Sequence, residues 1–290
     1  MKYPSATYTF AMLLLGTLGI FLNESGLPPT TAVFFRSFIG GILLCIFCLI
    51  TGLFRRENFS LKPVTLAIVS GLLMCVNWVA FFKALDAIGI STATVVFHIQ
   101  PFIVLIFSSV ILKERIGKSA YAWVMVGFLG LILACGGVSG VSLEWPYLIG
   151  IFYTSVAAAA YAGVTLITRT IQNLKPHLTS LIHCLVGAAL TAAFVEIPSQ
   201  GFSLSQEIWM LGLGFFPTAL SYVLIYGSTP KMNTASIAVL TFIYPSTAVV
   251  FDFLVYGNTL GVVGLLGFFC IVISSLAVNL RWSFFSFMKG

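Results

Sequence analysis

Residues 64–86 read VTLAIVSGLLMCVNWVAFFKALD, an apolar run that carries the polar and aromatic pair Asn77 and Trp78 in its second half. About 20 apolar residues in a helix suffice to cross the hydrocarbon core of a bilayer. The chain holds ten such runs, at residues 7–22, 29–53, 64–86, 90–112, 119–137, 146–168, 178–197, 207–227, 233–256 and 260–280. This pattern predicts an all-α integral membrane protein with ten transmembrane helices.

The run at residues 207–227 is a candidate second copy of the quoted one. A shift of 144 residues places the Asn-Trp pair on Ser221 and Tyr222, and the same shift places Pro101 on Pro245 without a gap. The ten runs then divide into five before residue 144 and five after it. We therefore predict two repeats, residues 1–144 and 145–290, packed in one compact bundle.

Five spans in each repeat have a topological consequence. An odd number of spans makes the second copy enter the membrane from the opposite side, and transporters built from inverted repeats use this arrangement to form a central site with two alternative openings. Carriage of a solute is therefore the leading hypothesis.

Charge agrees with a membrane protein and predicts its orientation. The chain is 59% hydrophobic and 8% charged, against roughly one quarter charged residues in soluble domains. Basic residues mark cytoplasmic loops, and most of them fall on one side of a ten-span chain: Lys2, Arg55, Arg56, Lys62, Lys113, Arg115, Lys118, Arg169, Lys175, Lys231, Arg281 and Lys289. Both termini are thus expected in the cytoplasm. The net charge of +6 reflects topology and contact with the lipid bilayer, and no nucleic-acid partner is expected.

The remaining sequence signals indicate neither a leader peptide nor a cofactor. The first apolar run follows Lys2 but has no small-residue cleavage site, so we interpret it as an uncleaved first span. The six cysteines lie inside apolar runs, where cysteine behaves as a small hydrophobic residue. Cys45 and Cys48 form a C-x-x-C pair without neighbouring metal-binding residues, and we predict no disulfide, no metal site, no cofactor and no catalytic residue.

Polar residues inside spans are costly and tend to face a cavity or a partner. His98 and Gln100 lie roughly 12–15 Å deep at ~1.5 Å per residue, near the bilayer midplane. Pro101 follows directly, and Pro245 is expected at the same level in the other repeat. Together with Pro217 they are candidate hinges around a hydrated or ligand-filled centre, because a proline frees a backbone carbonyl. Simple packing kinks are the alternative.

Aromatic and polar side chains near this level suggest a binding site. Asn77 beside Trp78, and Ser221 beside Tyr222, offer a hydrogen-bond partner next to an aromatic surface, which suits a small amphiphilic molecule. Tyr161 and Tyr244 extend the aromatic set, giving eight predicted substrate-binding residues: Asn77, Trp78, His98, Gln100, Tyr161, Ser221, Tyr222 and Tyr244. Each aromatic taken alone also fits ordinary packing.

Two charged residues inside spans are candidates for coupling or ion pairing. Arg36 lies about seven residues below the outer end of its run, so a carboxylate or carbonyl partner is expected, with Glu24 or the substrate's own carboxylate as candidates. Asp252 lies towards the outer end of the run at residues 233–256, where it could sit at the interface or relay protons.

Two other classes compete with a transporter. Gly137, Ser139 and Gly140 occur in a G-x-S-G pattern like that around the serine of intramembrane proteases. A nucleophilic serine needs a base within reach, whereas Ser139 falls in an outer loop and His98 near the midplane, so we expect a glycine-rich turn there. A channel or a non-transporting membrane scaffold remains as a further alternative, although it gives the repeat no evident purpose.

Several short stretches resemble the EamA-type carriers of the drug/metabolite transporter superfamily. They are Phe34–Phe38, Trp78–Leu85, Ser91–Ala93, Gln100–Pro101 and Leu112–Arg115 in the first half, and Tyr161–Arg169, Ala235–Ser236 and Tyr244–Ser246 in the second. The resemblance implies a ten-helix carrier of small metabolites with a central cavity between the repeats. One departure concerns the glutamate that closes the fourth span: Glu114 is present, whereas its counterpart in the second repeat is Asn258.

The combined interpretation is a secondary transporter in the bacterial inner membrane. We expect it to export small amphiphilic metabolites such as amino acids, aromatic ones included, by alternating access, as a monomer or a homodimer. A phosphorylated substrate would require several basic residues in the cavity, and Arg36 is the one available. Replacing Trp78 or His98 with alanine should abolish transport and leave the protein folded.

Overall fold

The structure is a computed structural model, and it describes residues 3–55, 60–111, 113, 115–134, 144–257, 262–280 and 282–284. Across this part the chain forms helices joined by turns, and no strand occurs. The α-helices are α1 (Pro4–Gly16), α2 (Leu18–Ser25), α3 (Pro29–Ile50), α4 (Leu61–Phe97), α5 (Gln100–Ile111), α6 (Lys118–Ala134), α7 (Trp145–Thr170), α8 (Pro176–Thr191), α9 (Leu204–Gly214), α10 (Ser221–Ser228), α11 (Thr234–Leu240), α12 (Ile243–Tyr256) and α13 (Val262–Asn279). Short 3₁₀ turns occur at η2 (Ala192–Phe194) and η4 (Thr229–Lys231), and a π turn at η3 (Phe215–Leu220).

Local sequence explains where several helices begin. Proline occupies one of the first two positions of α1, α3, α7 and α8, where its missing N–H would have no intrahelical partner anyway. Ser203 and Gln206 form a reciprocal capping box at the start of α9, and the Asn233 side chain accepts from the Ser236 backbone N–H at the start of α11. Such caps satisfy backbone donors that the helix itself cannot.

The third and fourth predicted runs form a single helical element, α4, which folds back on itself. Two residues 16 positions apart in a straight helix lie about 24 Å apart, yet the ring centroids of Phe81 and Phe97 are 4.8 Å apart. Phe97 also belongs to one buried cluster with Ala80 and with Ala157 of α7. Helical backbone thus continues through the predicted division between residues 64–86 and 90–112. The chain nevertheless reverses direction between Phe81 and Phe97.

Two helices are interrupted just before a proline. The first break is at His98 and Ile99, before Pro101, and the second at Thr241 and Phe242, before Pro245. Because Pro245 has no N–H to donate to the Thr241 carbonyl, that carbonyl accepts instead from the Tyr244 N–H at 3.3 Å. The two breaks thus fall at corresponding places in the two halves of the chain.

A third proline has a different effect. Pro217 lies in the π turn η3 between α9 and α10. Because Pro217 has no N–H, it cannot donate to the carbonyl of Leu213, four residues earlier. That carbonyl accepts instead from the Thr218 hydroxyl at 2.8 Å. The Ser221 hydroxyl donates to the carbonyl of Phe216 at 2.9 Å in the same way. These side chains satisfy backbone acceptors that the bilayer could not.

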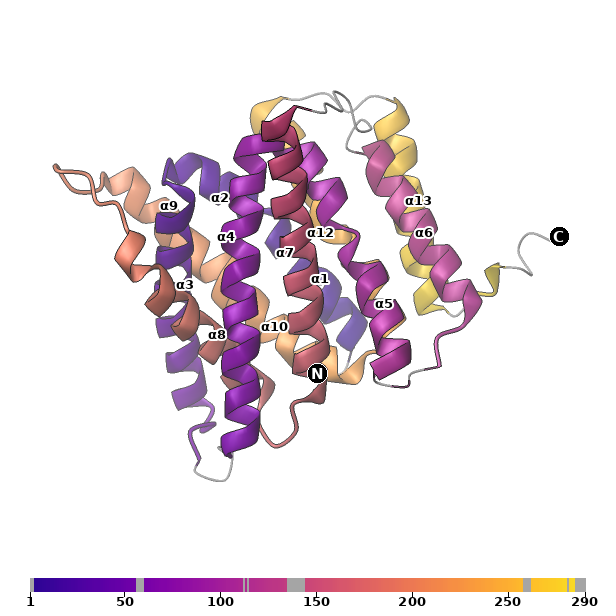
Figure 1. Cartoon of the computed structure of the whole chain (residues 1–290), viewed down its shortest axis with the longest axis horizontal. Helices are drawn as coiled ribbons and strands as arrows, with labels where there is room; N and C mark the ends of the chain where they lie inside the picture. Colours follow the sequence, from indigo (N-terminus) through magenta and orange to yellow (C-terminus); the bar gives the residue numbers. More distant parts are fainter. Residues whose placement is uncertain are drawn as a thin grey trace.

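Close helix pairs build the bundle around this interrupted centre. Helix α4 packs on α7, α3 on α8, and α1 on α10 and α12. Helices α6 and α13 form a pair at one edge of the molecule, with α2, α3 and α9 at the other (Figure 1). A Cβ added to Gly130 of α6 would lie 2.7 Å from the Gly267 carbonyl oxygen of α13, so this pair depends on small residues that let backbones approach.

The outer surface is that of a multi-pass membrane protein. Six helices of the described part are long and apolar enough to span a bilayer, and four shorter apolar helices accompany them: Gln100–Ile111, Lys118–Leu133, Thr234–Ala248 and Val262–Val278. Large apolar side chains face outward, including Ile50, Phe152 and Phe269, in numbers that would be unfavourable in water. The ten-span count and the cytoplasmic termini stay predictions.

Candidate functional site

A cavity of about 480 Å³ lies in the middle of the bundle, within the range of small-molecule sites. Its wall is built from α1, α3, α4, α7, α8, α10, η4, α11 and the starts of α2, α5 and α12. Six of the eight predicted substrate-binding residues line it, together with Arg36: Asn77, Trp78, Gln100, Tyr161, Tyr222 and Tyr244. The structure therefore brings together side chains from both halves of the chain.

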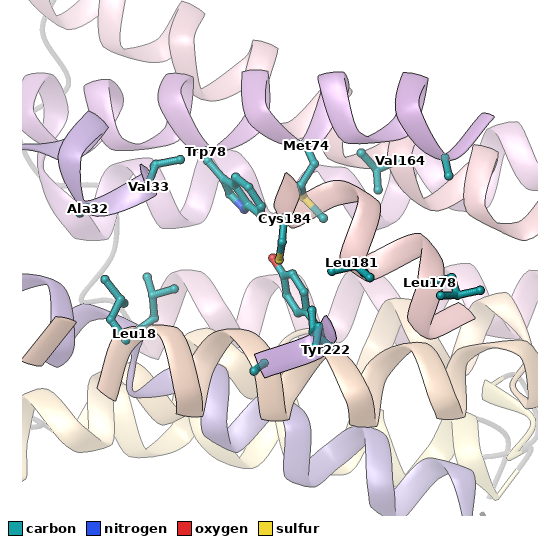
Figure 2. Packing of buried hydrophobic residues seen from close by; sticks show 14 of the residues in the cluster. Leu18, Ala32, Val33, Met74, Trp78, Val164, Leu178, Leu181, Cys184 and Tyr222 are labelled. Carbon is teal, nitrogen blue, oxygen red and sulfur yellow. The ribbon is translucent and has the colours of Figure 1, made fainter. Parts of the chain in front are cut away.

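Trp78 and Tyr222, which correspond across the repeat, face each other in the interior. Figure 2 shows the indole of Trp78 and the phenol of Tyr222 pointing toward one another from opposite ribbons, with Cys184 near the Tyr222 hydroxyl. The guanidinium carbon of Arg36 lies 4.8 Å from the centre of the Trp78 ring, and Arg36 Nη2 donates to the Tyr222 hydroxyl at 3.4 Å. A cation over an aromatic face is an attractive arrangement. Cation, indole and phenol thus form one group.

Tyr161 and Tyr244 lie on either side of the break in the first half. The ring of Tyr161 is 5.9 Å from that of Phe97, and the ring of Tyr244 is 6.1 Å from that of His98. His98 is buried, stacks on Phe242 at 5.8 Å and is not among the cavity-lining residues. Its imidazole therefore lies next to a cavity-lining ring, that of Tyr244, without lining the cavity itself.

The two small polar residues are placed differently from each other. Asn77 lines the cavity and donates its side-chain N–H to the Ala157 carbonyl at 2.9 Å, which ties α4 to α7. Ser221 is buried outside the cavity wall, with its hydroxyl on the carbonyl of Phe216. Gln100 lines the cavity at the start of α5. Of these three, Asn77 and Gln100 face the space in which a ligand would sit.

The predicted hinge prolines are buried at the helix interruptions and do not line the cavity. Pro101 and Pro245 follow the breaks in the two halves, and Pro217 lies in the π turn. Their positions let the helices around the cavity change direction, which is the geometric requirement for a hinge.

Glu24, one of the two partners expected for Arg36, is engaged elsewhere. Its carboxylate accepts from the Tyr256 hydroxyl at 2.8 Å, and the hydrogen bond of Arg36 goes to Tyr222. Glu24 lies at the end of α2, whereas Arg36 lies within α3. The Asp252 side chain lies outside the described part, and so do Ser139, Glu114 and Asn258.

Sequence reasoning missed a buried hydrogen-bonded chain behind the cavity. His183 Nε2 is 2.7 Å from the Ser70 hydroxyl, and His183 Nδ1 is 2.8 Å from the Tyr226 hydroxyl. Tyr226 lines the cavity one turn after Tyr222, so the helical period of four residues could have found it. Ser70 pairs with a histidine, but it is fully buried and does not line the cavity. We assign these three hydrogen-bonded side chains a structural role, because they link α4, α8 and α10.

The two ends of the cavity differ. Its wall reaches one end of the bundle at Arg169 and Ile171, where α7 ends, at Pro176, where α8 begins, and at Thr229 and Pro230 of η4. At the opposite end, hydrogen bonds join α2 to α12: the Asn23 side chain donates to the Tyr256 hydroxyl at 2.9 Å, and the Tyr256 hydroxyl donates to Glu24. None of these three residues lines the cavity. The cavity therefore extends toward the end that carries Arg169, which the charge pattern predicts to be cytoplasmic.

No cluster of three metal-binding side chains occurs among the described residues. The arrangement offers shape, aromatic surface, hydroxyl and amide groups and one buried cation. These groups can bind and orient a small molecule.

Comparisons with known proteins place the chain among transporters. The uncharacterized transporter YxxF of Bacillus subtilis is 28% identical over 261 residues, covering 87% of this chain and 84% of that protein. The pseudopaline exporter CntI of Pseudomonas aeruginosa is 29% identical over 163 residues, covering 55% of this chain and 54% of its own.

A solved crystal structure has the same fold, with a TM-score of 0.84 at 20% identity over 96% of this chain and 98% of that one. Two segments of the chain, residues 6–136 and 148–280, each match the EamA-like transporter family. These matches cover most of the chain and fall one in each half. The protein therefore belongs to the EamA-like transporter family, within the drug/metabolite transporter superfamily.

Proposed function

We propose that the protein is a secondary transporter that exports small amphiphilic metabolites, amino acids and aromatic amino acids included, across the bacterial inner membrane by alternating access. The observation that carries the proposal is the central cavity, which is closed at one end of the bundle and extends to the other. Family membership makes the protein a transporter, and the cavity is the place where a solute would bind.

The composition of the wall supports an amphiphilic ligand. Trp78, Tyr161, Tyr222 and Tyr244 provide aromatic surface, and Gln100 adds an amide beside them. A cavity of this kind buries an apolar body and orients it with a few hydrogen bonds. Sugars would require a denser set of polar groups, and polyphosphates a cluster of cations.

In the proposed mechanism the two halves of the chain move against each other. The breaks before Pro101 and Pro245 and the π turn at Pro217 would absorb the changes in helix direction. The end closed by Tyr256 would open while the end at Arg169 closes. The two family matches, one per half, support an inverted repeat as the basis of this motion.

The test is counterflow in proteoliposomes. Purified protein is reconstituted, preloaded with one unlabelled compound, and offered a labelled panel of amino acids, nucleobases and sugars with and without a pH gradient. We expect saturable exchange of amino acids. Right-side-out and inside-out vesicles then give the direction of transport. No flux of any compound above empty liposomes would contradict the proposal and favour a scaffold.

Trp78→Ala tests whether this cavity is the path. We expect its counterflow to fall to the level of empty liposomes, since the aromatic wall and the stacking surface for Arg36 are lost. Trp145→Ala is the matched control, because that indole is 74% exposed at the start of α7 and does not line the cavity. Wild-type flux in a folded Trp78→Ala protein would remove the cavity from the mechanism.

A further inference from the structure

Arg36 places an almost fully buried cation in the wall of the cavity. Its side chain is 3% exposed on α3. One guanidinium nitrogen donates to the Tyr222 hydroxyl at the long distance of 3.4 Å, and the group lies over the Trp78 ring. The Nε atom is buried and has no hydrogen-bond partner among the described residues. Most of the donors of this guanidinium are therefore unused.

A buried guanidinium in this state requires an explanation. Arginine stays protonated in proteins and carries five N–H donors in a fixed planar fork. Buried charges are normally paired, and buried polar atoms normally have partners. The described lining of the cavity contains Arg36 and Arg169 and no aspartate or glutamate. The pair that would normally compensate Arg36 is thus missing from the described wall.

A carboxylate has the shape and charge that this group lacks. Its two oxygens can accept a pair of parallel N–H donors from one guanidinium. The Trp78 and Tyr222 rings lie against the fork, and Met74, Phe81 and Phe97 continue the wall as apolar surface. A ligand with its acid group on Arg36 would therefore rest its body on aromatic and apolar side chains.

We infer that Arg36 binds the carboxylate of the transported compound, so that the substrates are small organic carboxylates with an apolar or aromatic body. This inference rests on the proposed transport function, whose site it shares. Amines without an acid group are excluded, because the described wall offers them two cations and no counter-charge.

The experiment compares four probes for binding to the purified full-length protein in detergent by isothermal titration calorimetry. L-Phenylalanine and 3-phenylpropanoate carry a carboxylate and a ring, 2-phenylethylamine carries the ring without the acid, and inorganic phosphate is an anion without an apolar body. We expect the first two to bind and the last two to bind at least tenfold more weakly. Equal binding of the amine, or no binding of either carboxylate, would overturn the inference.

Variants assign the effect to one side chain. Arg36→Gln should weaken binding of both carboxylates tenfold or more, and Arg36→Lys, which keeps the charge and loses the planar fork, should fall between it and the wild type. Arg55→Gln is the control, since Arg55 is exposed beyond the end of α3 and its removal should leave binding unchanged. If Arg36→Gln does not fold, the test rests on Arg36→Lys. An affinity of Arg36→Lys for both carboxylates equal to that of the wild type would contradict the inference.

Binding and flux separate this inference from the proposed function. If carboxylates bind in a way that depends on Arg36 but no compound shows counterflow, the transport proposal is refuted and the assignment of Arg36 as the carboxylate-binding residue stands. Counterflow of amines and carboxylates alike, unaffected by Arg36→Lys, would keep transport and refute the assignment.

Discussion

At the scale of single residues, the indole of Trp78 owes its position to a glycine on the opposing helix. A Cβ added to Gly187 of α8 would lie 2.8 Å from Cζ3 of Trp78 and 3.0 Å from the Ser37 hydroxyl oxygen. Real Cβ contacts are longer than this, so any side chain at Gly187 must push one of these two neighbours. The aromatic wall of the cavity therefore depends on a residue that does not itself line it.

Gly187→Ala should lower counterflow several-fold, because the indole is displaced toward the cavity. Gly19→Ala is the matched control: a Cβ there meets no atom within 4 Å, and alanine favours a helix over glycine by about 1 kcal/mol. Initial rates in proteoliposomes, normalised to reconstituted protein, give the comparison. Equal rates for Gly187→Ala and the wild type would show that the Trp78 position is not limiting.

The hydrogen-bonded side chains of Ser70, His183 and Tyr226 are expected to contribute to the stability of the fold. Replacing His183 with alanine removes the hydrogen-bond partner of the Tyr226 hydroxyl and one of the two partners of the Ser70 hydroxyl, which still donates to the Ala67 carbonyl at 3.0 Å. A buried polar group that loses its only partner costs about 1–3 kcal/mol. We expect His183→Ala to lower the midpoint of thermal unfolding in detergent clearly. His177→Ala should lower it less, since His177 is only partly buried and bonds one backbone carbonyl, that of Val223. The opposite order would argue against a structural role for His183.

Residue chemistry also explains which site residues the sequence could reveal. Polar and aromatic side chains inside apolar runs stand out because they are costly there, and Trp78, Tyr161, Tyr222 and Tyr244 were found in this way. Ser221 could not be placed, since a serine hydroxyl often bonds a carbonyl of its own helix, as this one does. The contact of Arg36 with Tyr222 joins residues 186 positions apart, so it required the fold.

At the scale of helical elements, the π turn at Pro217 sets which way Tyr222 faces. An extra residue in one turn rotates the following helix by about 100° relative to a continuous α-helix with 3.6 residues per turn. Tyr222 and Tyr226 of α10 both lie after η3 and both line the cavity. The π turn at Pro217 therefore sets the orientation of Tyr222 and Tyr226 in the cavity wall.

Pro217→Ala should reduce transport while leaving the protein folded. Alanine supplies the missing N–H, which allows a regular α-helix and turns Tyr222 away from Arg36. Pro198→Ala, in the loop before α9, is the control and should behave like the wild type. Counterflow and thermal unfolding of both variants make the test, and an active Pro217→Ala protein would show that the π turn is dispensable.

The elements show both the reach and the limit of sequence patterns. The apolar runs located the helices, and the prolines indicated where helices α5 and α12 begin anew, because a missing N–H leaves a mark in the sequence. The continuity of α4 through residues 86–90 was not foreseen, since the two apolar runs on either side look like separate helices in the sequence. The interruption at Thr17 between α1 and α2 also has no proline to announce it.

At the scale of the whole molecule, hydrogen bonds between the two halves hold one end of the bundle closed. Tyr256 of α12 joins Asn23 and Glu24 of α2, and the Glu196 N–H donates to the Thr31 hydroxyl at 2.9 Å. The side chains of Asn23, Glu24 and Tyr256 are exposed, and such contacts contribute modestly, about 1 kcal/mol each. That amount is enough to shift a balanced pair of states about fivefold.

Tyr256→Phe should therefore favour the state that is open at this end. A cysteine introduced at Leu18, which lines the cavity, reports the change through its rate of labelling by a membrane-impermeant thiol reagent added on that side. Because the variant loses both hydrogen bonds of the Tyr256 hydroxyl, we expect the rate to rise by a factor between about five and about thirty, and Tyr147→Phe at the start of α7 to leave it unchanged. An unaltered labelling rate in Tyr256→Phe would mean that packing, and not this cluster, closes the end.

The buried guanidinium has a consequence for energetics in a living cell. Residue 180, which corresponds to Arg36 across the repeat, is a serine, so the positive charge belongs to one half only. With a bound carboxylate that has no amine, such as 3-phenylpropanoate, the site is nearly neutral, whereas the empty site, or a site that holds a zwitterionic amino acid, keeps a net positive charge. A membrane voltage of 100 mV acts with up to about 2.3 kcal/mol on one elementary charge that crosses it. For such an amine-free carboxylate, voltage would thus act on the return of the empty carrier and hardly on the loaded step, whereas for an amino acid it would act on both, so electrical recordings can tell the two kinds of substrate apart.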